Sequence, residues 1–179
     1  MEDLAQHILD IAFNSVEAGA TELEINMRED LAANVLEFTV QDNGNGISPG
    51  DISKVLDPFF TTKENARIGL GLSLLKETVE GCDGVFQVES HPGKGTLVKA
   101  VCPHDHWDRL PLGDIAGTLV TLVTGNERLE IVYRHRFNDK TFFWSTLESK
   151  SLLKEVPLQS PPVLAWLGDY LEQRVRDLR

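Results

Sequence analysis

The chain has 179 residues, of which 17 are Lys or Arg and 28 are Asp or Glu, so its formal net charge is -11. With 41% hydrophobic and 25% charged residues, it can bury a core and belongs to neither the disordered nor the fibrous class. The acidity argues against nucleic-acid binding, which needs clustered basic residues. No apolar run approaches the roughly 20 residues that span a bilayer. The two cysteines, Cys82 and Cys102, favour a buried thiol pair over a disulfide. We therefore expect a cytoplasmic protein that binds neither nucleic acid nor membrane.

The charge divides the chain into two parts. Residues 1–103 hold 7 basic and 17 acidic side chains, whereas residues 104–179 hold 10 basic and 11 acidic ones. The change falls at Cys102-Pro103-His104, where an alternating strand pattern ends. The sequence thus predicts one domain over residues 1–103 and a small C-terminal extension over residues 104–179.

The first part predicts alternating helices and strands. Residues 3–18 carry the apolar stripe of an amphipathic helix, which Gly19 would end. Strands are expected over 21–27 and 34–41, and the second runs into a glycine loop at 42–46. A helical turn near 51–56, a helix over 71–80 and a hairpin of strands over 85–90 and 96–101 follow. This order predicts a mixed sheet with helices on one face.

The second part predicts a small α+β unit. Asp114 can cap a helix over 115–124, although the Thr and Val residues of that segment would also suit a strand. A hairpin is expected over 129–137 and 141–145, and Pro161-Pro162 opens a final helix to about residue 178. His104-Asp105-His106 has a spacing that could bind a metal, but no further Cys or His cluster completes four ligands.

Two motifs of the first part carry side chains suited to a metal and a base. Asp10 and Asn14 lie one helical turn apart and so share a face. The amide oxygen suits Mg²⁺, and the carboxylate could orient or deprotonate a water molecule. Asp42 ends a strand, where it could accept a hydrogen bond from an exocyclic amine. Gly44 and Gly46 beside it would let a flat base approach the backbone. A solvated helix face and a simple surface turn are the alternative interpretations.

Two further motifs suit phosphate groups. The segment Asp57–Lys63 contains two adjacent aromatic residues that would anchor a loop. Lys63, at the end of this loop, would face a polyphosphate. Gly69 and Gly71 open a helix whose free N–H groups form an anion site. Each motif alone is also compatible with an ordinary loop or an ordinary helix start.

In their order and spacing these motifs resemble the ATPase superfamily shared by gyrase, the heat-shock chaperone, histidine kinases and MutL-type repair proteins. Asp10–Ala20 is similar to the N box of that family, and Gly95-Thr96 is similar to its late Gly-Thr element. Asp42–Gly46 and Gly69–Gly71 resemble its two glycine boxes. The resemblance covers residues 1–103 and is closest to the ATP-binding domain of histidine kinases, although Asn14–Thr21 looks like the MutL type.

The resemblance implies a two-layer α/β sandwich of the Bergerat type that binds ATP and Mg²⁺. Asn14 would coordinate Mg²⁺, Asp42 would bind adenine N6, and Thr96 would help to bind the base. Gly44 and Gly46 would line the base pocket, and Asp10 would be the catalytic residue. The phosphates would meet Lys63, Gly69 and Gly71, and Arg67 would either contact them or stiffen the lid.

Two functions follow from these expectations. The chain begins inside the N box, so we expect no phosphoacceptor dimerisation segment of its own. It would act as a protein kinase in trans on an unidentified protein partner, or as a weak ATPase. The alternative is an ATP-responsive binding module without hydrolysis, because position 10 is Asp where hydrolysing members of the family carry Glu. His7 is expected to be a helix-face residue and not a phosphoacceptor.

Overall fold

The computed structural model describes residues 3–56 and 71–179 of the chain. In this part of the chain, helices and strands alternate. The elements are, in chain order, α1 (Leu4–Glu17), β1 (Glu22–Asp30), β2 (Val35–Asp42), α2 (Ile52–Val55), α3 (Gly71–Glu80), β3 (Val85–His91), β4 (Gly95–Pro103), α4 (Ile115–Gly125), β5 (Glu130–Phe137), β6 (Lys140–Ser145), α5 (Thr146–Leu153) and α6 (Pro161–Leu178).

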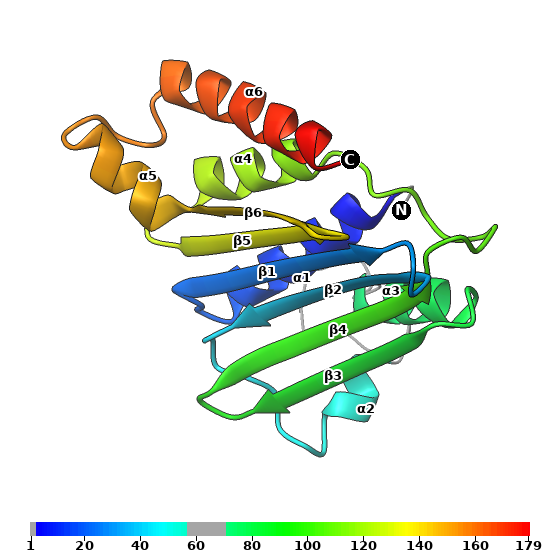
Figure 1. Cartoon of the computed structure of the whole chain (residues 1–179). Helices are drawn as coiled ribbons and strands as arrows, with labels where there is room; N and C mark the ends of the chain where they lie inside the picture. The colour runs from blue at the N-terminus through cyan, green and yellow to red at the C-terminus, as the bar shows by residue number, and fades with distance from the viewer. Residues whose placement is uncertain (1–2, 57–70) are drawn as a thin grey trace.

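The six strands form one mixed sheet with the order β3-β4-β2-β1-β5-β6. Neighbouring strands are antiparallel except β1 and β5, which run parallel with Leu23 opposite Ile131. The helices α1, α3, α4 and α6 lie on one side of this sheet (Figure 1). The structure is therefore the two-layer α+β sandwich that the sequence predicts, with helices on one face.

Alternation along the strands separates the core from the open face of the sheet. In β1, the side chains of Leu23, Ile25 and Met27 are buried beneath the helices, and the intervening side chains point to the opposite face. That open face is polar, and ion pairs cross it: Arg134 on β5 contacts Glu24 on β1 at 3.2 Å. Burial on only one face fixes the register, because a slip of one residue would bring charged side chains into the core.

The opening helix shows how the local sequence sets its boundaries. Asp3 caps α1, and its Oδ1 accepts a hydrogen bond from the Gln6 N–H at 2.9 Å. Leu4, Ile8 and Ile11 repeat at helical spacing and are buried against the sheet. Gly19 then adopts a φ of +79°, which ends the helix and turns the chain into β1.

The strands of residues 104–179 join the same sheet as those of residues 1–103. Strand β5 pairs with β1, and the side chains of both parts contribute to one hydrophobic core. The segment before α4 also closes the start of α1, since the N–H groups of Leu4 and Ala5 donate to the carbonyl oxygens of Pro111 and Leu112 at 3.0 and 2.9 Å. The extension thus continues the first sheet, and the division into a domain over residues 1–103 and an extension over residues 104–179 stays a prediction.

The structure confirms the expected hairpin over β5 and β6 and the final helix α6. It resolves the ambiguity at residues 115–124 in favour of a helix, since Asp114 caps α4 through the Gly117 N–H at 2.8 Å. Helix α5 was not expected, because its only start signals are Ser145, which accepts from the Glu148 N–H, and a short polar run. Among the described residues, no helix has the length and apolar character needed to cross a membrane.

Candidate functional site

A cavity of about 110 Å³ lies between α1 and the ends of β2 and β4. It gathers four residues that the sequence singled out: Asn14, Asp42, Gly46 and Thr96. The wall around these polar groups is mostly apolar, and the remaining lining residues are Ile11, Ser15, Ala18, Ile47, Leu72 and Val98. Among the lining residues in the described part of the chain, none carries a positive charge. An apolar wall with a few converging polar groups is typical of a site for a flat organic ligand.

Asp42 is held in one orientation by three donors. Its Oδ1 accepts hydrogen bonds from the backbone N–H of Gly44 at 2.8 Å and of Thr96 at 3.3 Å. Its Oδ2 lies 2.8 Å from the Ser15 hydroxyl on α1, which is its donor. Because Oδ1 already has two donors, Oδ2 is the carboxylate oxygen with free capacity to accept from a ligand. The strand end therefore presents a fixed acceptor to the cavity.

Glycines allow the backbone around Asp42 to approach closely. A Cβ built on Gly95, which has a φ of +88°, would lie only 1.9 Å from the Asp42 carbonyl oxygen. A Cβ on Gly46, with a φ of +68°, would lie 2.1 Å from the His91 carbonyl oxygen. The glycine loop and the turn between β3 and β4 are thus pressed together, and neither position has room for a side chain. Gly44 is buried beside Asp42 and supports it through its N–H.

Asp10 and Asn14 lie next to the N-terminal end of α3, and Asn14 also lines the cavity. A Cβ on Gly71 would lie 3.3 Å from Asp10 Oδ2 and 3.8 Å from Asn14 Nδ2, so the helix start faces both side chains. Helix N-termini favour anions, and Gly71 leaves room for one to approach. The other residues expected at this end, Lys63, Arg67 and Gly69, lie outside the described residues.

The donor set at this end fits a Mg²⁺ ion that is shared with a phosphate ligand. Asn14 is exposed and offers a neutral oxygen, and Asp10 offers a carboxylate one turn away. The described residues contain no group of three or more His, Cys, Asp or Glu side chains that could enclose a metal. Mg²⁺ normally takes one or two protein ligands and completes its shell with phosphate oxygens and water.

Two serines of the site were not predicted from the sequence. Ser15 follows Asn14 on α1 but points to the buried side, where it is only 3% exposed. Ser90 on β3 is 5% exposed and contacts both the glycine loop and Thr96. The position of Ser15 on the apolar stripe of the helix indicates only that it is buried, and the alternation along β3 indicates the same for Ser90. Neither pattern shows which groups the two hydroxyls contact.

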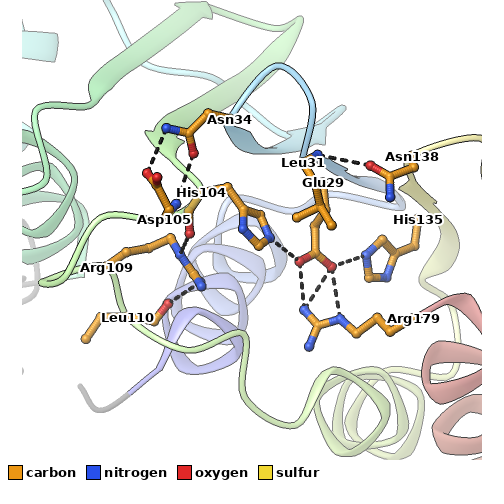
Figure 2. A network of polar contacts seen from close by, with 10 residues as sticks. All are labelled: Glu29, Leu31, Asn34, His104, Asp105, Arg109, Leu110, His135, Asn138 and Arg179. Carbon is orange, nitrogen blue, oxygen red and sulfur yellow. Dashed lines mark hydrogen bonds and ion pairs between the residues drawn. The ribbon is translucent and has the colours of Figure 1, made fainter.

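A second polar cluster lies at the other end of β1 (Figure 2). The carboxylate of Glu29 is 1% exposed and contacts His135 Nε2 at 2.9 Å, His104 Nε2 at 3.0 Å and the Arg179 guanidinium at 2.8 Å. Burial alone would raise the pKa of Glu29, but the hydrogen bonds from His135, Arg179 and His104 outweigh it and lower the pKa to about 2. Glu29 is therefore a buried carboxylate anion that joins β1 to the C-terminal part of the chain.

The histidine motif His104-Asp105-His106 does not converge on one point. His104 contacts Glu29, whereas His106 Nε2 lies 3.7 Å from Asp83 Oδ2. His7 is only 1% exposed, so it belongs to the buried side of α1, and burial lowers its pKa to about 4. Neither ring nitrogen of His7 has a hydrogen-bond partner among the described residues.

Known proteins are similar in sequence to the first part of the chain. The sequence profile of the family described as "Histidine kinase-, DNA gyrase B-, and HSP90-like ATPase" matches residues 1–106. Sporulation kinase A of Bacillus subtilis (strain 168) is 37% identical over 103 residues, which are 56% of this chain and 16% of that protein. The probable C4-dicarboxylate sensor kinase of the same organism is 31% identical over 101 residues, which are 56% of this chain and 19% of that protein. The chain thus spans less than a fifth of the length of either relative.

Comparison of the structure extends the likeness of fold beyond residue 106. The N-terminal domain of a DNA repair protein superposes with a TM-score of 0.57 at 18% identity, over 82% of this chain and 53% of that chain. Because 82% of 179 residues exceeds the 106 that match the family profile, the shared fold includes strands or helices of the C-terminal part. At this identity the likeness concerns the fold alone.

Proposed function

Because the chain belongs to the family of histidine kinase-, DNA gyrase B- and HSP90-like ATPases, we propose that it binds Mg²⁺-ATP in the cavity beside α1 and acts on it as a kinase or an ATPase. The observation that carries this proposal is the Asp42 carboxylate, fixed by three donors in an apolar cavity that Asn14 also lines. Adenine would occupy the apolar part, and its N6 amino group would donate to Asp42 Oδ2.

The triphosphate would extend from the base toward Asp10, Asn14 and the start of α3. Asn14 would hold Mg²⁺, which supplies charge neutralisation at the phosphates when bound. Gly69, Gly71, Lys63 and Arg67 would contact the phosphate oxygens through backbone N–H groups and cationic side chains. Cations and backbone donors are needed here because residues 1–103 carry an excess of acidic side chains.

Asp10 would accept the proton of the attacking group. It lies on the exposed face of α1, beside the backbone of Gly71, where a water molecule or an acceptor side chain can reach it. With water as the nucleophile the protein would be a weak ATPase, and with a side chain of a second protein it would be a kinase acting in trans. We further propose that the protein works in the cytoplasm with such a protein partner, without binding nucleic acid or membrane.

A second function is supported by the shared sheet. The end of β2 borders the cavity, β2 pairs with β1, and β1 pairs with β5. A structural change at the bound nucleotide would therefore reach the C-terminal part through neighbouring strands. Asp10 reaches less far than the Glu of hydrolysing relatives, which suits binding without turnover. The protein would then be an ATP-responsive module whose affinity for a partner depends on the nucleotide.

Turnover and binding measured on the same variants separate the two functions. The protein is incubated with Mg²⁺-ATP, ADP formation is followed, and nucleotide affinity is measured by calorimetry. For an enzyme, we expect ADP from the wild type, and Asp10→Asn should abolish its formation while leaving affinity within about twofold. Asn14→Ala should remove the Mg²⁺ dependence of binding. Binding without ADP above background would reject the ATPase and leave phosphotransfer to a protein acceptor, or the responsive module, as the function.

A further inference from the structure

Ser90 is buried next to the cavity, where it contacts two of the residues that line it. It stands opposite Thr96 in the pairing of β3 with β4, and its side chain points to the same face of the sheet as the core. Its hydroxyl oxygen contacts three groups: the Ile47 backbone N at 2.7 Å, the Gly95 carbonyl oxygen at 3.0 Å and Thr96 Oγ1 at 2.9 Å. Both Ile47 and Thr96 line the cavity.

These three contacts determine the direction of each hydrogen bond. The Ile47 N–H can only donate, and the Gly95 carbonyl can only accept. Ser90 has one hydrogen, so this hydrogen goes to Gly95 when all three contacts are hydrogen bonds. The contact with Thr96 must then be donated by the Thr96 hydroxyl. As a result, Thr96 Oγ1 has no hydrogen left for the cavity and can only accept there.

We propose that Ser90 is a positioning residue that sets the nucleobase specificity of the site by holding the Thr96 hydroxyl as a hydrogen-bond acceptor. This inference rests on the proposed function, since it concerns the base of the bound nucleotide. Asp42 Oδ2 is also an acceptor, so the polar wall of the cavity offers two acceptors and matches an amino group, which carries two hydrogens. A 6-oxo purine places a carbonyl oxygen at that point, opposite two acceptors, and is disfavoured.

The test compares ATP with inosine triphosphate, whose base has a carbonyl in place of the 6-amino group. Dissociation constants for both are measured by calorimetry on the wild type, Ser90→Ala, Thr96→Val and the double variant. We expect the wild type to prefer ATP. Ser90→Ala should lower the ratio of the two constants by about tenfold, because the Thr96 hydroxyl can then rotate and donate to the carbonyl.

The double variant tests whether Ser90 acts through Thr96. If it does, Thr96→Val alone lowers the ratio by a similar factor, and adding Ser90→Ala lowers it no further. Ser48→Ala is the matched control. Ser48 lies next to Ile47 in the chain, but its exposed hydroxyl contacts Asp51 and does not line the cavity. This variant should leave the ratio unchanged, and Thr96→Ser, which keeps a hydroxyl, should retain the preference for ATP.

The possible outcomes distinguish a failure of this inference from a failure of the proposed function. A Ser90→Ala protein that loses affinity for both nucleotides equally would show a merely structural role and overturn the inference. If Ser90→Ala does not fold, Thr96→Val decides, because it keeps the contacts of Ser90 with Ile47 and Gly95; an unchanged ratio there overturns the inference. A wild type that binds neither nucleotide would overturn the proposed function and this inference together.

Discussion

Asp42 owes its position to donors from three separate parts of the chain. Ser15 comes from α1, the Gly44 N–H from the loop, and the Thr96 N–H from β4. The sequence predicted Asp42 and Thr96 through the motifs that they belong to. It could not predict Ser15, because an apolar stripe tolerates a small hydroxyl residue and only the fold brings this one within 2.8 Å of the carboxylate. Residues such as Ser15, which support a site residue, belong to no recognisable motif. Their role follows from contacts that only the folded structure shows.

The buried His7 should make stability depend on pH. Its pKa is lowered from 6.5 to about 4, so the unfolded chain binds a proton at His7 more readily than the folded one. The free energy of unfolding should therefore fall as pH drops from about 6.5 toward 4. Glu29 does not add to this pH dependence. Because its pKa is lowered from 4.5 to about 2, its contribution to the free energy of unfolding is fully present above about pH 4.5.

Urea unfolding at several pH values tests this expectation. Between pH 6.5 and 4.5, His7→Leu should have a shallower dependence of unfolding free energy on pH than the wild type. His91→Gln, which changes an exposed histidine on the turn between β3 and β4, is the control and should keep the slope of the wild type. Equal slopes in the wild type and His7→Leu would show that His7 is not the group responsible.

At the scale of elements, the turn between β3 and β4 is built around the backbone of Asp42. Gly93 in this turn and Gly95, the first residue of β4, have positive φ values of +74° and +88°, but a Cβ on Gly93 would meet nothing within 4 Å. Gly93→Ala should therefore destabilise the protein by only about 1–2 kcal/mol, the strain of the left-handed conformation. Gly95→Ala adds a clash with the Asp42 carbonyl and should cost about 3 kcal/mol or more.

The same pair of variants connects stability to the site. Because relief of the clash must move Asp42, Gly95→Ala should also lose most of its affinity for ATP, whereas Gly93→Ala should bind like the wild type. Denaturant unfolding and calorimetry on both proteins measure the two effects. Equal stability and equal affinity in the two variants would contradict the close approach of this turn to Asp42.

The elements differed in how well local sequence signals determine them. Helices α1, α4 and α6 have caps or a proline start and apolar residues at helical spacing, and their predicted bounds agree with the structure to within one residue or two. The parallel pairing of β1 with β5 could not be predicted, because no local pattern specifies which edge of a sheet a later strand joins. The charge difference between the two parts instead suggested a separate extension.

At the scale of the whole molecule, Glu29 connects the C-terminal part to the strand β1 of the shared sheet. Glu29→Gln would leave His104, His135 and Arg179 facing a neutral side chain. It should lower the free energy of unfolding by about 2–4 kcal/mol, since charge-assisted hydrogen bonds in a buried position are lost. Figure 2 shows how these partners converge from β5, from the residue that follows α6 and from the segment after β4.

Glu24→Gln is the matched control for this prediction. Glu24 lies on the same strand but on the open face, and its ion pair with Arg134 is exposed. Its loss should cost less than about 1 kcal/mol. Urea unfolding at pH 7 measures both variants, and an equal cost would mean that the buried cluster does not hold the two parts together.

The central claim is that the cavity binds ATP through Asp42, and calorimetric titration with Mg²⁺-ATP tests it most directly. The wild type should bind, and Asp42→Asn should lose about tenfold to a hundredfold or more in affinity, because the substitution places an amide N–H₂ where backbone and ligand donors converge. Asp51→Asn, which changes an exposed carboxylate of the following loop, should bind like the wild type. Equal affinity of the wild type and Asp42→Asn, or no binding by the wild type, would contradict the claim.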